Sequence, residues 1–501
     1  MTLQPGLEGS LAESRGDQQR DQQSDLQRKG LGRTVLRGFP RREELAAKAE
    51  WHAPELILLH RPGIESYFGN LFAAGSLNQG PCSVEEAQVE HDSFKEVLED
   101  CTPAEVWDIS DVLMQAQHDE SLLDELKNYV ARALDFSTTH IFPPDLEKVL
   151  GQKRYTIERL SAEKLVETCL LLPAITCKYN VPRMNTGFDQ DINVRPLNNF
   201  IFLRDQQIIT DKGIVVGNMN SSQRSSETWL MQFVFKVLGV RLQTQLYGEL
   251  KLEGGDFIPA GDIAFQGVGL RTNMEAVREL LQRQCYGFPE VAVVVDQHRQ
   301  QDEMHLDTYF NITSRDTCFV LDERVKERPT GSRKDTYVVV YRRRDDGTYH
   351  AANATEVFGG NGAVSKRELR YDETTPMFPF RDYLSEKGFR IVEVSKELQQ
   401  SYALNFLTIG ENKVVGIDIA AKEDLKKRLV SLERRCGPQD FFPMHDYHRL
   451  GSEFQELMAR KGIHFIPVVM NDLNLMYGSA HCMTQVARAP IVGSGVPGGV
   501  L

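Results

Sequence analysis

The sequence predicts an α/β fold built from several similar modules. Short apolar runs typical of buried strands recur from residue 200 towards the C-terminus, and stretches of helical length separate them. The composition, at 41% hydrophobic and 26% charged residues in a chain of 501, is that of a globular protein with a large core. These observations set the fold class but not the number of modules.

The N-terminal third is predicted to contain one strand and then mainly helices. Residues 55–60 have the composition of a buried strand, and Arg61-Pro62-Gly63 is a turn signal that ends it. Helices are expected at 84–101, 120–135 and 162–171. In the second of these, Leu122, Leu126 and Val130 recur at helical spacing, which predicts packing against the core. Residues 108–175 therefore form a helical block.

The rest of the chain alternates between strands and helices. Strands are expected at 200–203, 213–216, 263–265, 290–295, 305–310, 318–321, 337–341, 413–417 and 465–469. Helices are expected at 227–238, 274–285 and 425–432.

Charge and cysteine usage exclude several classes of protein. A formal net charge of −13 argues against a nucleic-acid partner, because phosphates reward basic surfaces. No apolar run reaches the roughly 18–20 residues that span a membrane, and we expect no membrane association. Eight cysteines, sparse and irregularly spaced, indicate reduced thiols in a cytoplasmic protein. Organelle targeting by the N-terminal residues stays open, and a homo-oligomer is compatible with the sequence.

Four polar clusters interrupt the apolar runs, at residues 199–205, 253–256, 305–308 and 481–484. Each has an ordinary structural explanation when taken alone. Asp205 could cap a turn, and Gly254 and Gly255 could supply the positive φ of a tight turn. His305 and Asp307 would share one face of a strand, and Cys482 could be one more buried thiol.

Together the four clusters supply the parts of one reaction centre. A cysteine nucleophile needs a nearby histidine for proton transfer, and that histidine needs a carboxylate to orient it. A guanidinium group is planar and carries five N–H donors, so its recognition needs carboxylates around its edge. One cysteine, one histidine, one glutamate and two aspartates meet these needs.

At these residues the sequence resembles the arginine deiminases of the guanidine-modifying (pentein) superfamily, from about residue 50 to 490. Residues 196–205 (PLNNFIFLRD) are similar to the family's P-[LM]-x-N-x-x-F-x-R-D segment. The tetrapeptides EGGD (253–256), HLDT (305–308) and HCMT (481–484) match the family in order and separation. Residues 86–94 resemble an early family helix.

The resemblance implies a five-bladed α/β propeller with an inserted small helical bundle and a site on its pseudo-fivefold axis. The implied domains are a disordered N-terminal extension (1–45), a catalytic propeller domain (46–107 and 176–492) and the inserted helical subdomain (108–175).

The resemblance also implies the roles of the site residues. Asp205 and Asp307 would hold the guanidinium nitrogens, and Cys482 would attack the central carbon. His305, oriented by Glu253, would protonate the departing ammonia and then activate water, giving citrulline from L-arginine through a covalent thiouronium. The substrate-binding residues would be Asn199, Phe202, Arg224 and, after a one-residue gap in the match, Arg271. The mechanism needs no metal and no cofactor.

Two segments depart from the family pattern. Tyr477 stands where an arginine of the family meets the substrate carboxylate, and residues 76–80 replace a loop with paired acidic residues. Both changes concern recognition of the amino-acid end of the substrate. An amidinotransferase, or a hydrolase of another guanidino compound, is therefore the alternative prediction, and a non-catalytic arginine-binding protein is a third.

Overall fold

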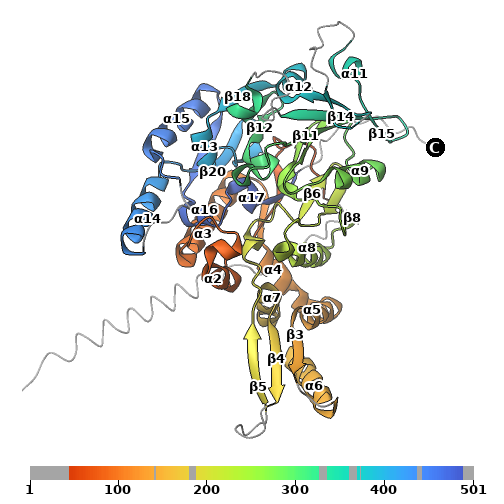
Figure 1. Ribbon diagram of the computed structural model, residues 1–501, viewed down its shortest axis with the longest axis vertical. Coiled ribbons are helices and arrows are strands. Elements are labelled where there is room, and N and C mark those ends of the chain that lie inside the picture. The colour runs from red at the N-terminus through yellow and green to blue at the C-terminus, as the bar shows by residue number, and fades with distance from the viewer. Residues whose placement is uncertain are drawn as a thin grey trace, which may run out of the picture. The chain divides into compact units, whose positions relative to one another are not determined.

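The computed structural model describes residues 45–139, 143–179, 188–326, 336–359, 369–372, 374–436 and 443–488 (Figure 1). The predicted disorder of residues 1–45 lies outside the described residues except for Leu45, which is buried. The end of the predicted catalytic domain, after residue 488, also lies outside them. No helix within the described ranges has the length and apolar character needed to cross a membrane.

Five three-stranded units of one topology form the framework. In each unit the middle strand pairs antiparallel with the strand before it and parallel with the strand after it. The units are β6 (Gln207–Thr210), β7 (Gly213–Val216), β8 (Leu242–Gln245); β9 (Phe257–Ala260), β10 (Ile263–Val268), β11 (Glu290–Val295); β12 (Phe310–Ser314), β13 (Thr317–Leu321), β18 (Arg390–Val394); β19 (Leu407–Gly410), β20 (Lys413–Ile417), β21 (His464–Val468); and β22 (Gln485–Arg488), β1 (Pro54–Leu59), β2 (Glu105–Asp108).

The fifth unit joins the two ends of the described chain. Its first strand, β22, is the last in sequence, and it pairs antiparallel with β1, so that Ile57 lies opposite Val486. Every residue of β1 except Glu55 is buried, as the apolar composition of residues 55–60 predicted. The N-terminal strand is thereby held in the core by the segment that follows the predicted nucleophile.

Each parallel pair requires a long crossover, and helices supply it, because a tight turn cannot connect two parallel strands. The crossovers contain α3 (Val84–Cys101), α8 (Ser225–Val237), α9 (Met274–Gln282), α12 (Phe380–Glu386), α14 (Lys422–Cys436) and α15 (Tyr447–Arg460). A further short helix, α13 (Lys396–Gln400), follows β18 and leads to the next unit. The predicted helix 84–101 and the strands 213–216, 290–295 and 413–417 are confirmed with the same bounds.

The second unit has the largest sheet. β14 (Tyr337–Arg343) pairs antiparallel with β11, and it carries β15 (Tyr349–Ala351) and β17 (Pro376–Pro379) on its other side. β16 (Leu369–Arg370) completes that sheet. Along the chain, the short helix α10 (Asp322–Val325) precedes β14, and α11 (Ala354–Phe358) lies between β15 and β16. The predicted strand at 337–341 is confirmed.

Two predicted strands are wrong. Residues 200–203 belong instead to a 3₁₀ turn, η3 (Asn198–Ile201), and the loop after it. At 305–310, η7 (Leu306–Thr308) precedes β12, so His305 and Asp307 do not share a strand face. Residues 200–203 are a short apolar run buried on all sides, and such a run has no period that separates a strand from a turn. Residues 305–310 mix polar and apolar side chains, and only their last residue, Phe310, belongs to the strand.

The segment between β2 and β6 contains more than helices. Its helices are α4 (Ile109–Met114), α5 (Glu120–Ala133), α6 (Pro143–Arg159) and α7 (Ala162–Leu171), with the turn η2 (Gln115–His118). A three-stranded sheet accompanies them, formed by β3 (Asp135–Thr139), β4 (Ala174–Tyr179) and β5 (Phe188–Asn193), in orange to yellow in Figure 1. The predicted boundary at residue 175 falls inside β4, because the polar strands β3 and β5 have no apolar run that would predict the sheet.

Short elements carry the loops that matter for function. They are α2 (Ile64–Asn70), η1 (Ala73–Ser76), η4 (Ser222–Arg224), η5 (Gly254–Asp256), η6 (Gln301–Glu303), α16 (Asn471–Leu475) and α17 (Ala480–Met483).

Candidate active site

Equivalent positions in the five units meet at one site. Asp205, Glu253, Asp307, Asn405 and Cys482 each lie just before the first strand of a different unit. All five side chains are buried. Repetition of one topology thus places five polar side chains together from segments far apart in the sequence. Asn405 is the member that no motif indicated.

Cys482 is held by Asn405 on two sides. The amide Nδ2 of Asn405 donates to Sγ of Cys482 at 3.1 Å, and the backbone N–H of Cys482 donates to Oδ1 of Asn405 at 3.2 Å. Asn405 Nδ2 also lies 3.2 Å from the carbonyl of Asp307. The amide therefore fixes the sulfur relative to the neighbouring aspartate, a role that sequence reasoning missed.

The Cys482 thiol is protonated in the free site. Burial raises its pKa well above the usual value, and the carboxylates of Asp307 and Asp205 raise it further. The thiol donates to Oδ2 of Asp307 at 3.5 Å. A cation that enters between the carboxylates would reverse this, because an opposite charge stabilises a thiolate.

Asp307 is oriented by the residue that precedes the nucleophile. Nδ1 of His481 lies 2.7 Å from Oδ2 of Asp307, and both side chains are fully buried. Burial alone would raise the pKa of Asp307, but the hydrogen bond from His481 lowers it below the usual value. Oδ1 of Asp307 is buried without a hydrogen-bond partner among the described residues.

His481 is itself held from behind by a buried ionic group. Its Nε2 lies 3.7 Å from Oε1 of Glu50, and its carbonyl accepts from Nε of Arg204 at 3.2 Å. Glu50 is paired with Arg488 of β22. Burial raises the pKa of Glu50, but Arg488 and His481 outweigh it and keep the carboxylate ionised.

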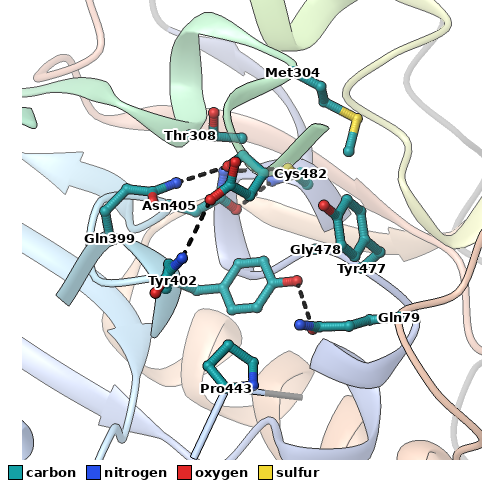
Figure 2. Close-up of a pocket in the computed structure, with 12 residues that line it drawn as sticks. Gln79, Met304, Thr308, Gln399, Tyr402, Asn405, Pro443, Tyr477, Gly478 and Cys482 are labelled. Atoms are coloured by element: carbon teal, nitrogen blue, oxygen red, sulfur yellow. Dashed lines mark hydrogen bonds between the residues drawn. The ribbon is translucent and has the colours of Figure 1, made fainter. Parts of the chain in front are cut away.

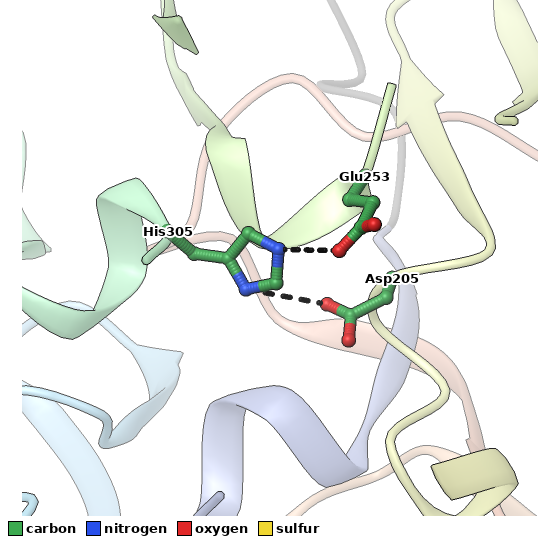
Figure 3. Close-up of side chains that lie close together, drawn as sticks. All are labelled: Asp205, Glu253 and His305. Atoms are coloured by element: carbon green, nitrogen blue, oxygen red, sulfur yellow. Dashed lines mark hydrogen bonds and ion pairs between the residues drawn. The ribbon is translucent and has the colours of Figure 1, made fainter. Parts of the chain in front are cut away.

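His305 is held between two carboxylates (Figure 3). Its Nε2 lies 2.8 Å from Oε2 of Glu253, and its Nδ1 lies 3.7 Å from Oδ1 of Asp205. Burial lowers the pKa of His305, but Asp205 and Glu253 overcome it and raise the pKa to about 9. Burial likewise raises the pKa of Glu253, but His305 brings it down to about 2. At neutral pH the pair is an imidazolium and a carboxylate.

The two glycines after Glu253 are required by close approach and not by a positive φ, which corrects the sequence prediction. Neither Gly254 nor Gly255 lies in the left-handed region. A Cβ on Gly254 would lie 2.0 Å from the carbonyl oxygen of Arg204, and one on Gly255 would lie 2.7 Å from Nδ1 of His305. The absence of side chains lets the η5 backbone pass directly under the histidine.

Asp205 is anchored by Arg224 and Glu227. Nη1 of Arg224 donates to Oδ2 of Asp205 at 2.7 Å, and its Nε donates to Glu227 at 3.0 Å. Nη2 of Arg224 reaches Glu227 and the carbonyl of Asn199. Arg224 is thus neutralised by two buried carboxylates, and Glu227 is a second residue that sequence reasoning missed. Oδ1 of Asp205 accepts no hydrogen bond from a described residue.

Two cavities meet at Cys482, and their common wall consists of Met304, Thr308, Tyr477 and Cys482. The first, here called the charged cavity, has a volume of about 40 Å³. It is lined by Leu77, Asn199, Phe202, Asp205, Arg224, Arg271, Gln301, Met304, His305, Thr308, Met476, Tyr477 and Cys482.

The second, here called the amide cavity, has a volume of about 80 Å³ (Figure 2). It is lined by Gln79, Asp302, Met304, Thr308, Gln399, Gln400, Tyr402, Asn405, Pro443, Tyr477, Gly478 and Cys482. Gln79 and Tyr477, from the two segments that depart from the family pattern, both line it.

Arg271 is the uncommitted cation of the charged cavity. Its Nη2 lies 3.3 Å from Sδ of Met304, and its Nε is buried without a hydrogen-bond partner in the part of the chain that the structure describes. No carboxylate of a described residue lies within ion-pair distance of it. Arg271 therefore differs from Arg224, whose charge is already balanced.

One group among the described residues has the spacing of metal ligands, namely Asp205, Glu253 and His305, whose donor atoms lie within 4.8 Å of one another. Nε2 of His305 and Oε2 of Glu253 are hydrogen-bonded to each other, so a metal would have to displace that bond. The observed geometry is that of an oriented proton donor.

All nine residues predicted from the sequence belong to this site. Eight line the cavities or flank Cys482 directly, and Glu253 contacts His305 from behind. A buried cysteine, an ionised imidazole and two carboxylates with unpartnered oxygens form a reaction centre for a cationic substrate. The class of protein that fold and site define is a hydrolase acting on the C–N bonds of amidines, and the comparisons with known proteins agree.

The sequence model described as arginine deiminase matches residues 77–488, and the chain belongs to the arginine deiminase family. It is 24% identical to an arginine deiminase of Halobacterium salinarum, over 89% of this chain and 96% of that one. It is 25% identical to an arginine deiminase of Limosilactobacillus reuteri, over 56% of this chain and 69% of that one. A solved structure of DDAH from Pseudomonas aeruginosa, complexed with citrulline, matches with a TM-score of 0.42 and 12% identity, over 87% and 99% of the chains.

Proposed function

We propose that this protein hydrolyses L-arginine to L-citrulline and ammonia, with Cys482 as the nucleophile. The observation that carries the proposal is a pair of buried carboxylate oxygens, Oδ1 of Asp205 and Oδ1 of Asp307, neither of which accepts a hydrogen bond from a described residue. Both carboxylates are close enough to Cys482 to raise its pKa. Buried polar atoms without partners are rare and require an explanation. The N–H groups of a guanidinium edge would satisfy both.

The first half-reaction follows from the charges around Cys482. The guanidinium enters between Asp205 and Asp307 and packs its plane on Phe202. Its positive charge lowers the pKa of the thiol, which releases its proton to solvent and attacks the central carbon as a thiolate. His305, already an imidazolium, donates its proton to the departing nitrogen. The C–N bond breaks, ammonia leaves, and a thiouronium on Cys482 remains.

The second half-reaction uses the same imidazole as a base. Neutral His305 takes a proton from water, and the resulting hydroxide adds to the thiouronium carbon. The C–S bond breaks, the proton of the added hydroxyl passes to the departing sulfur, and citrulline is released with the Cys482 thiol restored. Glu253 keeps the imidazole oriented through both steps by the bond to Nε2. Neither step requires a metal or a cofactor.

The carboxylate of arginine is proposed to bind Arg271, Asn199 and the remaining N–H of Arg224. Arg271 contributes most to this, because its charge is uncompensated, whereas Arg224 mainly fixes Asp205. Tyr477 takes the place of the family's third contact and can offer only a neutral hydroxyl.

The finer architecture is also a proposal. The five units would be the blades of a five-bladed α/β propeller with the site on its axis, formed by residues 46–107 and 194–492, so that the second segment begins after β5 and not at the predicted residue 176. The segment after β2 would be the inserted subdomain, extended to the end of β5. Support comes from the shared strand topology and from the equivalent positions of the five site residues. A cytoplasmic location and a homo-oligomeric state stay predictions.

Two arginine variants test the substrate assignment. Arg271→Ala is expected to raise KM for arginine about 10- to 100-fold, the equivalent of one charge-assisted contact, and to leave agmatine, which lacks the carboxylate, unaffected. Arg224→Ala is expected to reduce turnover of both substrates, because Asp205 loses its anchor. Citrulline, N-carbamoylputrescine and ammonia are measured. Equal losses on both substrates for Arg271→Ala would contradict its role at the carboxylate.

Alkylation by iodoacetamide tests the protonation state of the free site. Only the thiolate reacts, so the inactivation rate is expected to rise about tenfold per pH unit. It should reach no plateau below pH 9, because the pKa of Cys482 is raised well above its usual value. Arginine turnover at pH 7 would nonetheless be efficient, because the bound guanidinium lowers the pKa of the Cys482 thiol. A plateau of the alkylation rate near pH 7 would show that the free enzyme already holds a thiolate.

A further inference from the structure

The amide cavity is left unused by the reaction proposed above, although it is lined by Cys482. Its lining includes Cys482 but neither Arg224 nor Arg271. It combines side-chain amides and hydroxyls with apolar groups such as Met304 and Pro443, and Asp302 is its single charged group. Its volume of about 80 Å³ accommodates several molecules the size of water or ammonia, since roughly 10–15 Å³ suffices for one.

The side-chain amides and hydroxyls of the amide cavity offer hydrogen bonds to such molecules. Gln399 is buried, its Nε2 donates to the carbonyl of Asp302 at 2.7 Å, and its Oε1 is buried without a partner among the described residues. Gln79 and Tyr402 meet across the cavity, where the hydroxyl of Tyr402 donates to Oε1 of Gln79 at 3.2 Å (Figure 2). A small molecule bound here finds the two or more polar partners that an ordered water needs.

Water has to reach the thiouronium carbon while the substrate chain is still bound, so a second route to Cys482 is needed. After ammonia leaves, the rest of the arginine is still attached to Cys482, and its chain fills the charged cavity as far as Arg271. Water must still reach the same carbon. The amide cavity opens on the same sulfur and shares Thr308 and Met304, which precedes His305, with the charged cavity.

We propose that the amide cavity is the binding site and passage for the small neutral co-reactants, with water entering and ammonia leaving through it while the charged cavity is occupied by the amino-acid chain. The inference rests on the proposed function, because it needs the thiouronium. It assigns to Gln399, Gln400, Gln79 and Tyr402 a role in the second half-reaction.

Two tryptophan variants, one per cavity, separate the two routes. Gln400→Trp fills the amide cavity from the half-buried end of α13, and Gln301→Trp is the matched control that fills the charged cavity from an exposed position. Acid-quenched single turnovers with labelled arginine measure ammonia formation, citrulline formation and the mass of the Cys482 peptide.

For Gln400→Trp we expect ammonia in the first turnover at a rate within about twofold of wild type, and citrulline formation slowed about tenfold or more. The thiouronium mass on Cys482 should accumulate. For Gln301→Trp we expect the reverse, with a raised KM, slower first-turnover ammonia and no accumulated adduct. Gln79→Trp fills the amide cavity from the position that contacts Tyr402, and we expect it to give the same result as Gln400→Trp. It keeps the test available if Gln400→Trp does not fold.

Hydroxylamine gives an independent readout, because it is neutral near pH 7.5 and larger than water. Its nitrogen forms a bond to the thiouronium carbon, the C–S bond breaks, the proton passes to His305, and N-hydroxyarginine leaves. The ratio of N-hydroxyarginine to citrulline should fall in Gln400→Trp and stay unchanged in Gln301→Trp.

The inference is overturned if Gln400→Trp and Gln79→Trp fold and release citrulline at the wild-type rate, or if they slow ammonia and citrulline equally. A product ratio unchanged in both would also overturn it. If wild-type protein forms no ammonia from arginine, the proposed function fails. This outcome differs from failure of the inference, because it is measured on the wild-type protein alone.

Discussion

Replacing Cys482 with serine is expected to abolish citrulline release, with a loss of at least about 10⁴-fold in kcat. A hydroxyl can occupy the sulfur position and accept the hydrogen bond from Asn405, so the fold should be retained. Its pKa is too high for the bound guanidinium to generate the alkoxide, so the attack on carbon is lost. Ammonia and citrulline are both measured under reducing conditions, and thermal unfolding checks the fold.

Cys436→Ser is the matched control, since that thiol is exposed and lies at the end of α14. It should leave turnover unchanged. Isothermal titration should show that Cys482→Ser still binds arginine, because Asp205, Asp307 and Arg271 are intact. Residual turnover near the wild-type level in Cys482→Ser would remove the covalent mechanism, and a wild-type protein that binds arginine without turnover would be a non-catalytic member of the family.

Replacing His305 with asparagine is expected to reduce kcat by about 10²- to 10⁴-fold, the usual contribution of a general acid and base. The loss should affect the first-turnover ammonia and the release of citrulline alike, because the same imidazole serves both steps. His350→Asn is the control, since His350 forms a similar 2.8 Å contact with Glu356 at a half-buried position outside the site. A wild-type ammonia burst in His305→Asn would show that another group donates the proton.

Glu253→Gln provides the finer test of this histidine. The carboxylate helps to raise the pKa of His305 to about 9. In wild type, the alkaline fall of activity should follow loss of the His305 proton near that pH. Without the Glu253 charge the imidazolium is less stable, so the fall should move to lower pH. If Glu253→Gln lost activity at every pH while the alkaline fall stayed at the same pH, Glu253 would have a purely structural role.

The sequence could predict those site residues that belong to a short local motif, and it could not predict the others. Cys482, His305 and Asp205 stand in recognisable short patterns, and the structure brings all three together. Asn405, Glu227 and Glu50 carry no such pattern, because an isolated polar residue between apolar runs looks the same whether it is buried or exposed. Only their burial and contacts show that they hold Cys482, Arg224 and His481.

The roles of some predicted residues also changed with tertiary contacts. Arg224 and Arg271 are equivalent as sequence signals, yet Arg224 is enclosed by Asp205 and Glu227 while Arg271 stays uncompensated. Gly254 and Gly255 suggested a turn of positive φ, but it is the backbone of Arg204 and the ring of His305 that exclude a side chain there.

The sequence by itself determined the α/β class, most of the central strands and the chemical groups of the reaction. Those properties are local, since a β-branched apolar run or an amphipathic period is complete within one segment. The tertiary structure decided the common topology of the five units, the sheet that accompanies the inserted helices, and the two cavities at Cys482. Those features depend on contacts between segments far apart in the chain, such as Asp307 with His481 and β1 with β22, and no local pattern encodes which distant segment will be the partner.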